Sequence, residues 1–577
     1  MGFLQTPQSF YDLDLFQFNL HSESKIPNEQ DYFYRDIEVA RTRTNSCIYG
    51  GSNTVLSRRA LEDIGGFYTE AITEDFATGI LIQKAGYVSL GISKRLASGV
   101  SAKKLQELIQ QRVRWARGVI STGKKMHIYT SKDLSFGQKI NYWASIWYWY
   151  APIKRLCYIL SPILYGAFGF MVFRCTIWQV LLFWLPMYVS STVSLRLLSN
   201  NIRNTKWTAI YEYALFPYML LPVILETFGF SLKKFKVTKK SGISNERRNF
   251  LYMTPLIILI ALSIIGIVRC IAVVFVSGSL GPIVVLFWLI YNMYAMIMCL
   301  FFVDGRNVYR GAERVYVELE SWLIVDDKRY PVITKYISET GIALYLDKPI
   351  LINNNENRMA AVEVVDGKRK ARFNVLTKHT KEIKQGKWLY TFSIEDIDDV
   401  NYDNLLAVLY DRVPVNPSEI KRNNGVYDDL LTNISHRVTS QSSLKRHYPR
   451  INIGRYIPAM IDGEAGVIKV KNFNYQYFAT ETLADTKEEN GEVVAKEVEF
   501  IVGKFKIKTR YEETVNKMHL YRVLDFEKIY FEERNRDAIM EAILKIVRDS
   551  KDRGGDNNTE KNIGYKDMTT FSEMSIV

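Results

Sequence analysis

The chain has 577 residues, 48% of them hydrophobic, and a formal net charge of +14. This length allows several domains, and the apolar content is enough for both a folded core and membrane spans. The apolar residues gather between about residue 150 and residue 303, and much of the positive excess flanks that block. A membrane surface or a phosphorylated ligand is therefore favoured over nucleic acid as the partner.

The cysteines and histidines indicate no metal site and no disulfide framework. Of the five cysteines, only Cys47 lies outside the apolar runs, and the six histidines are scattered. The other cysteines lie in or beside apolar runs: Cys157, Cys175, Cys270 and Cys299. These spacings do not fit a zinc site, so no metal ligand is predicted.

Residues 1–130 alternate short apolar segments with turn signals and helical patterns, such as the turn at Gly65 and Gly66. This pattern is typical of part of an α/β domain. The stretch is short for a complete nucleotide-binding fold, so we expect that an upstream portion is missing. Asp12 and Asp14 form a pair of acids, which we interpret as part of a loop.

Four apolar runs follow, each of roughly 20 residues, the length that a helix needs to cross a bilayer. They are residues 156–173, 175–195, 250–268 and 282–303. A shorter run at 213–225 contains Pro217 and Pro222, which favours an interfacial helix. Lysines and arginines concentrate in the connection 196–249, so the positive-inside rule places both termini in the cytoplasm.

The composition becomes that of a soluble protein after residue 303. The β-rich stretches 315–319 and 342–346 predict a small β-barrel within residues 304–415.

Residues 416–550 predict an α+β domain of unassigned role. Its expected elements are strands at 497–502 and 505–511 and a helix near 536–547 with one apolar face. The polar end, residues 551–577, predicts a disordered tail.

Two polar segments in the first 130 residues carry the types of side chain that catalysis uses. The segment Thr73–Asp75 places two acids at the start of a helical pattern, and the segment Gln111–Trp115 combines amide, guanidinium and indole groups. Taken alone, the first also fits helix capping and the second fits an interfacial amphipathic helix.

Together these segments resemble the TED and QxxRW motifs of the processive family-two glycosyltransferases of the bacterial cellulose synthase type. Gln5-Thr6-Pro7 is similar to the QTP segment of that family, and residues 235–240 are similar to its FxVTxK gating loop. Ser241 stands where the family often has glycine. The four segments occur in the order of the family, with the apolar runs where the family has its membrane helices.

The resemblance implies roles for single residues. Asp75, with Glu74 beside it, would be the general base that deprotonates the acceptor hydroxyl. Gln111 and Arg114 would contact the diphosphate leaving group, and Trp115 would stack under the acceptor sugar. The remaining residues implied are Gln5, Thr6 and Pro7 for substrate binding and Phe235, Val237, Thr238 and Lys240 for the gating loop.

Arg310–Val315 and Ser338–Gly341 resemble the RxxxR and SxxG parts of a PilZ domain, which binds cyclic di-GMP. The implied ligand contacts are Arg310, Arg314, Ser338 and Gly341. Tyr336 stands where the PilZ pattern has Asp or Asn. A structural barrel preceded by a solvated basic linker remains the alternative.

The resemblance thus implies a multidomain protein of the bacterial inner membrane with several spans. Its parts would be a partial α/β, GT-A-like transferase domain, an α-helical transmembrane bundle, a PilZ β-barrel and the α+β C-terminal domain. The corresponding ranges are 1–130, 131–303 with the gating loop near 233–242, 304–415 and 416–550, followed by the tail 551–577.

The implied function is processive, inverting transfer of glucose from UDP-glucose to a growing β-glucan, with export of the glucan and activation by cyclic di-GMP. Mg²⁺ would be bound by aspartates of the missing half, so that the chain alone is expected to be inactive, and additional synthase subunits are expected as partners. Two alternatives stay open. One is a channel and regulatory half that needs a separate donor-binding polypeptide. The other is a mixed-linkage glucan as the product, because Gly50 stands where the family usually has cysteine.

Overall fold

The computed structural model describes most of the chain up to residue 549. The residues outside the description are 24, 173, 175, 231–249, 307–313, 353–359, 385, 412–418, 421–424, 440–447, 462, 482–496, 516–517, 533 and 550–577. The predicted gating loop, Arg310 and the predicted tail lie among them.

The chain divides into two compact units, each of which is described by itself. The first unit comprises Met1–Val315 and Arg412–Ser442, and the second comprises Tyr316–Asp411 and Ser443–Val577. An α/β part, long apolar helices and β-barrels all occur, which confirms the predicted fold class of a multidomain membrane protein.

A small sheet organises the N-terminal part of the first unit. Strand β1 (Phe3–Gln5) lies between β3 (Thr54–Leu56), to which it is antiparallel, and β4 (Ser89–Gly91), to which it is parallel. A separate parallel pair joins β2 (Ser9–Phe10) to β5 (Ser98–Gly99).

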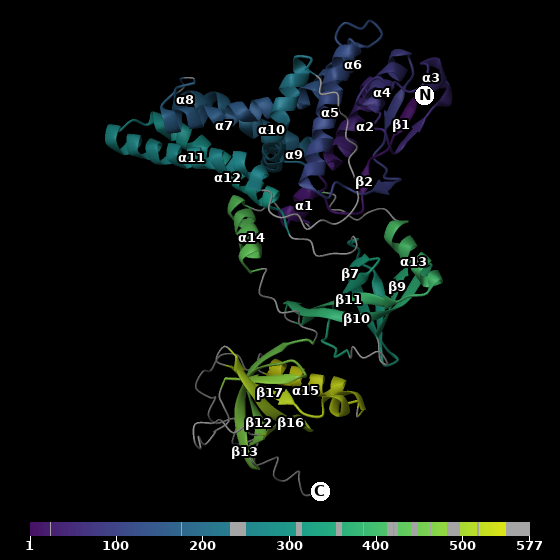
Figure 1. Cartoon of the computed structure of the whole chain (residues 1–577), viewed down its shortest axis with the longest axis vertical. Coiled ribbons are helices and arrows are strands. Elements are labelled where there is room, and N and C mark those ends of the chain that lie inside the picture. The colour runs from purple at the N-terminus through teal and green to yellow at the C-terminus, as the bar shows by residue number, and fades with distance from the viewer. Residues whose placement is uncertain are drawn as a thin grey trace. The chain divides into compact units, whose positions relative to one another are not determined.

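Six helices accompany these strands: α1 (Leu15–Asn19), α2 (Glu38–Arg41), α3 (Arg58–Asp63), α4 (Glu74–Lys84), α5 (Leu105–Lys125) and α6 (Phe136–Tyr148). In Figure 1 these six helices are coloured from purple to blue, and α2, α3 and α4 lie beside β1.

Asp14 has a structural role at the start of α1. Its carboxylate accepts a hydrogen bond from the backbone N–H of Gln17, and the Gln17 side chain returns a bond to the Asp14 backbone, which is a capping box. Asp12 accepts hydrogen bonds from Ser101 and pairs with Lys103. Both acids lie outside helices and strands, as the sequence predicts.

The helices that follow differ in two respects from the sequence prediction. Among the residues that the structure describes, four helices are long and apolar enough to cross a membrane: Val180–Leu198, which includes α9 (Leu185–Leu198), then α10 (Thr205–Thr227), α11 (Phe250–Ser277) and α12 (Gly281–Asp304). The helix α7 (Ala151–Phe168), which overlaps the predicted run 156–173, is not among these four. A short helix, α8 (Ile177–Gln179), precedes the first of them.

The run 213–225, predicted to be interfacial, lies inside α10. Asn204 caps this helix by accepting a hydrogen bond from the N–H of Trp207 at 2.8 Å, so the helix begins well before the two prolines. Pro217 and Pro222 stand within it without ending it. Helices buried among others tolerate proline because neighbouring groups satisfy the freed carbonyls, and α10 packs against α5, α7 and α12.

One hydrophobic core connects the α/β part to the apolar helices. It includes Phe16 of α1, Phe76 of α4, Ala116 of α5, Phe216 of α10 and Phe302 of α12. Phe16 and Phe302 stack with their ring centroids 4.1 Å apart. The α/β part is therefore fixed to the apolar helices within the first unit.

The helix α14 (Val426–Thr439) belongs to the first unit, although the sequence assigns residues 416–550 to one domain. Its Arg437 donates to the backbone oxygens of Asn19 and Phe301 and lies 3.6 Å from the carboxylate of Asp304. These contacts join residues that are far apart in the sequence, so no local sequence pattern could predict that α14 belongs to the first unit.

The second unit contains two closed barrels. The first barrel has the strand order β10-β11-β8-β7-β6-β9, and α13 (Asp399–Tyr410) packs on β10. Its strands are β6 (Glu320–Val325), β7 (Lys328–Ser338), β8 (Gly341–Leu346), β9 (Ala360–Asp366), β10 (Arg369–Lys384) and β11 (Lys387–Asp396). The predicted small barrel is present.

The second barrel, with strand order β12-β13-β14-β17-β16-β15, accounts for most of the region of unassigned role. Its strands are β12 (Ile451–Ile461), β13 (Glu464–Phe473), β14 (Tyr477–Thr480), β15 (Glu497–Val502), β16 (Phe505–Val515) and β17 (Met518–Val523). The helix α15 (Arg536–Asp549) lies where the apolar face predicts one, with Ile539 and Ile543 fully buried.

Candidate active site

Gln5 and Thr6, at the end of β1, hold the loop that follows Ile48. The Gln5 side-chain oxygen accepts a hydrogen bond from the N–H of Gly50 at 2.9 Å, and its amide donates to the carbonyl of Ser52 at 2.9 Å. The Thr6 hydroxyl donates to the carbonyl of Asn53 at 2.8 Å. Gln5 and Thr6 are 1% and 4% exposed, so they can shape a substrate site only through this loop.

The Asp75 carboxylate lies directly against that loop. Gly51 has a φ of +76°, and a Cβ built on it would stand 2.7 Å from Oδ2 of Asp75. Only glycine adopts this conformation readily and also leaves room for the carboxylate. The residue at position 51 thus borders the predicted base.

The electrostatic surroundings of Asp75 suit a base. Burial raises its pKa from 3.8 to about 6, and the neighbouring Glu74 adds to the rise. The backbone N–H of Phe76 and the charge of Arg114 act in the opposite direction. A carboxylate with a pKa of this size is a stronger proton acceptor than an ordinary aspartate and still ionised at neutral pH.

The helix α5 carries the other predicted residues and packs closely on the start of α4. A Cβ on Gly118 would meet the Thr73 side chain at 2.3 Å, so only glycine permits this approach. The hydroxyls of Thr73 and Thr122 lie 3.4 Å apart. This contact fixes α5 beside the segment that holds Asp75.

Arg112, within the QxxRW segment, positions the indole of Trp115. Its guanidinium forms a buried ion pair with Glu29 and lies 4.5 Å from the centre of the Trp115 ring. Trp115, Gln111 and Arg114 remain partly exposed. The arrangement brings a base, a cation and an aromatic face to the same part of the first unit.

The helix α5 is also tied to a candidate membrane span. Nε of Arg117 lies 2.9 Å from the Glu226 carboxylate of α10, and both side chains are largely buried. Lys124 donates to the backbone oxygen of Glu226 at 3.1 Å. The predicted acceptor-binding helix therefore rests on α10.

The metal implied by the resemblance has no site among the described residues. No group of three or more His, Cys, Asp or Glu side chains lies close enough there to hold an ion. The chemistry of the described site residues is that of the base, the cation and the aromatic ring.

The residues predicted to bind cyclic di-GMP are only partly described. Ser338 ends β7 and donates to the carbonyl of Gly341, the first residue of β8, at 2.9 Å. A Cβ on Gly341 would lie 2.5 Å from the carbonyl oxygen of Phe392 in β11, so strand packing requires glycine. Tyr336 is buried, and its ring lies 5.8 Å from that of Tyr316 between centroids, in a T-shaped contact. Arg314 is described, whereas Arg310 and the gating-loop residues are not.

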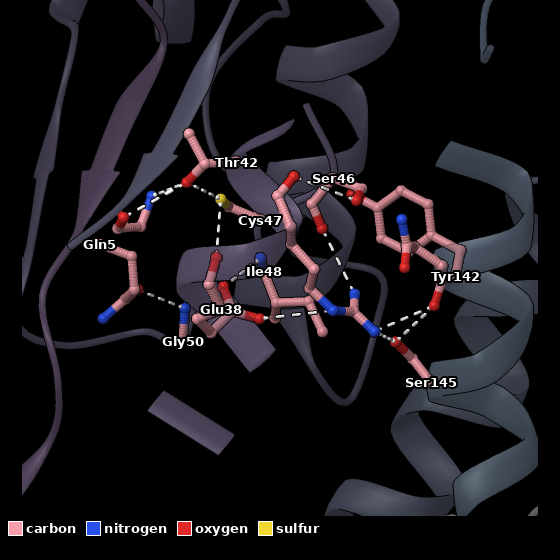
Figure 2. Close-up of polar contacts among 12 residues, drawn as sticks. Gln5, Glu38, Thr42, Ser46, Cys47, Ile48, Gly50, Tyr142 and Ser145 are labelled. Atoms are coloured by element: carbon pink, nitrogen blue, oxygen red, sulfur yellow. Dashed lines mark hydrogen bonds and ion pairs between the residues drawn. The ribbon is translucent and has the colours of Figure 1, made fainter. Parts of the chain in front are cut away.

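Sequence reasoning missed the groups that fasten the loop before Gly51, shown in Figure 2. Glu38 accepts from the N–H of Ile48 at 2.8 Å, and Arg41 donates to the carbonyl of Ser46 at 3.3 Å. Gln83 donates to the carbonyl of Cys47 at 2.8 Å. Because these contacts join separate segments, no local pattern indicates them.

Comparison with known proteins gives a family for the N-terminal part and relatives for more of the chain. Residues 1–194 match the model of glycosyl transferase family group 2. The cellulose synthase catalytic subunit of Pseudomonas fluorescens is 27% identical over 62% of this chain and 49% of its own length. Cellulose synthase 1 catalytic subunit of Komagataeibacter xylinus is 25% identical over 69% of this chain and 54% of its own length. The chain spans about half the length of the curated relatives it matches.

Solved structures show a weaker likeness. The Borreliella burgdorferi PlzA protein in complex with c-di-GMP is 10% identical, with a TM-score of 0.15, over 41% of this chain and 95% of its own. Escherichia coli YcgR in complex with c-di-GMP is 10% identical, with a TM-score of 0.14, over 41% of this chain and 88% of its own. TM-scores of this size support no inference about this chain. Residues 1–194 therefore match a family 2 glycosyltransferase model, and a larger part of the chain is similar to bacterial cellulose synthase catalytic subunits.

Proposed function

We propose that the chain carries the base and the acceptor platform of a processive, inverting synthase that transfers glucose from UDP-glucose to a β-glucan. The observation that carries this proposal is the position of Asp75. The Asp75 carboxylate borders Gly51 and interacts electrostatically with Arg114. Asp75 belongs to α4, the helix against which α5 packs.

The chemistry that these residues can perform is a single displacement. The acceptor hydroxyl gives its proton to Asp75 while its oxygen forms a bond to the anomeric carbon of the donor. The bond from that carbon to the diphosphate oxygen breaks, and UDP leaves. Gln111 and Arg114 bind the departing diphosphate, and Trp115 supports the acceptor sugar.

Export and regulation complete the proposal. The connection of α5 to α10 through Arg117 and Glu226 supports delivery of the product into the membrane helices, in a multi-pass protein with cytoplasmic termini. The first barrel, preceded by Arg314 and carrying the Ser338–Gly341 turn, is proposed as the cyclic di-GMP receptor. Additional synthase subunits belong to the same proposal.

Donor and product are tested in native membranes. Membranes are incubated with radiolabelled UDP-glucose, UDP-galactose or UDP-N-acetylglucosamine, and the polymer is digested with a β-1,4-glucanase or a mixed-linkage glucanase. We expect incorporation from UDP-glucose alone and release by the β-1,4-glucanase. Release only by the mixed-linkage enzyme would identify the other glucan, and incorporation from another donor would contradict the proposed substrate.

A second candidate function, which the sequence leaves open, is that of a channel and regulatory half. In that case the chain supplies the channel, the base and the regulatory barrel, and another polypeptide binds the donor. Purified chain in nanodiscs would then make no polymer, and addition of a membrane extract from a strain lacking the chain would restore synthesis.

A further inference from the structure

The segment from Ser46 to Gly50 has no regular secondary structure, yet side chains bind several of its backbone groups. Arg41 binds the carbonyl of Ser46, Gln83 that of Cys47, Glu38 the N–H of Ile48, and Gln5 the N–H of Gly50. A buried loop needs such partners because each unpaired backbone group is costly. Figure 2 shows the side chains of Glu38 and Gln5 beside Ile48 and Gly50 of this segment.

Two of these partners form a buried ion pair. Glu38 and Arg41 are 1% and 6% exposed, and Nε of Arg41 lies 3.9 Å from Oε1 of Glu38, so the two charges are in contact without a hydrogen bond between these atoms. The guanidinium of Arg41 also donates to the carbonyl of Asn141 at 3.0 Å and to the hydroxyl of Ser145, both in α6. The pair thus connects the loop to α2 on one side and to α6 on the other.

The backbone of Glu38 is itself held tightly. Its carbonyl oxygen would lie 2.6 Å from a Cβ on Gly91, so β4 presses against α2 at this residue. The thiol of Cys47 donates to the same oxygen at 3.4 Å. The loop therefore has little freedom while the pair is intact.

A buried ion pair is a poor means of gaining stability, because desolvation offsets most of the attraction. Neutral or apolar side chains could fill the same space at lower cost. A buried pair at this place is better explained by the single arrangement that it imposes on the loop. That loop ends at Gly51, beside the Asp75 carboxylate.

We propose that Glu38 and Arg41 are positioning residues, whose ion pair holds the Ser46–Gly51 loop in the one place where it borders Asp75. The consequence for catalysis rests on the proposed function. The effect of the pair on the position of the loop is independent of the proposed function, and it can be measured without an activity assay.

Cys47 provides the measurement, because its side chain is fully buried in the loop. The full chain in nanodiscs is labelled with a maleimide, and peptide mass spectrometry follows Cys47 separately from the other cysteines. Glu38→Ala leaves the N–H of Ile48 and the charge of Arg41 without their partner. We expect Cys47 to react about 5- to 150-fold faster, the range given by the loss of one buried hydrogen-bond partner.

Two further variants separate loosening of the loop from unfolding. Glu38→Gln keeps an oxygen for the N–H of Ile48 and removes only the charge, so we expect a smaller increase. Asp12→Asn removes another buried carboxylate of the same unit, paired with Lys103, and should leave the reactivity of Cys47 unchanged. Cys270 and Cys299, buried in α11 and α12, should stay protected in every variant that is folded.

The second readout is turnover in native membranes. Because the loop borders the proposed base Asp75, Glu38→Gln should lower kcat and leave the KM for UDP-glucose close to that of the wild type. A general folding defect would lower the amount of active protein, and it would not raise the labelling rate of Cys47 while Cys270 and Cys299 stay protected.

The outcomes are distinct. Unchanged Cys47 reactivity in Glu38→Ala would overturn the proposal whether or not polymer is made. Faster labelling of Cys47 with an unchanged kcat would refute the claim that the loop positions Asp75 for catalysis. Absence of polymer with the wild type would contradict the proposed function, and the labelling would still decide whether the pair holds the loop.

Discussion

Replacement of Gly51 by alanine tests the contact between the loop and the proposed base. The new Cβ would lie 2.7 Å from Oδ2 of Asp75, whereas ordinary contacts begin at 3.4 Å. The carboxylate must therefore retreat by about 0.7 Å if the backbone stays in place. A displacement of about 1 Å at a reacting group can lower a rate by about 100-fold, so we expect kcat to fall on the order of 10- to 100-fold.

The chain contains a matched control for the backbone strain. Gly65 has a φ of +81° and no atom within 4 Å of its Cβ position. Gly65→Ala and Gly51→Ala should therefore share a cost of about 1–2 kcal/mol for the left-handed conformation, read from thermal unfolding of the purified chain. Only Gly51→Ala should lower kcat for polymer synthesis in native membranes. Equal kcat values for the two variants would refute the placement of Asp75 against this loop.

Three further predictions concern the base and the first barrel. Because burial raises the pKa of Asp75 to about 6, kcat/KM should fall as the pH drops through about 6 and be constant above about 7. A fall of kcat/KM only near pH 4 would contradict the burial of Asp75. Gly341→Ala should lower the unfolding free energy of the barrel by about 1–3 kcal/mol, because its Cβ would meet the backbone of Phe392. A thermal unfolding curve equal to that of the wild type would contradict the close packing of Gly341 on Phe392. Arg314→Ala should weaken cyclic di-GMP binding about 10- to 150-fold in calorimetry on the full chain, the range for one charge-assisted bond, with an unchanged melting temperature; equal affinity would remove the regulatory proposal.

The residues of the candidate site could be predicted from the sequence, whereas the contacts that arrange them could not. Asp75 and the α5 residues were found because their order and spacing form motifs, and α15 because its apolar residues share one face. The approach of Gly118 to Thr73 and the pair of Glu38 and Arg41 depend on segments that meet only in the folded chain. These contacts have no periodicity that a sequence could display.

The same reason explains two of the differences between the predicted and the observed fold. The prolines of α10 suggested a short interfacial segment, but the packing of α10 against α5, α7 and α12 supports a helix through them. The return of α14 to the first unit depends on Arg437 reaching Asp304, more than one hundred residues earlier in the sequence. Closure of the second barrel likewise requires β12 to pair with β15 across two intervening strands.

The most direct test of the central claim is the Asp75→Asn variant in native membranes. Asparagine keeps the size of the side chain but cannot accept the proton of the acceptor hydroxyl. With equal amounts of protein and an unchanged melting temperature, we expect UDP-glucose-dependent polymer synthesis to fall at least about 100-fold, the lower range for loss of a general base. Synthesis at the wild-type rate would contradict the assignment of Asp75 as the base, and with it the proposed active site.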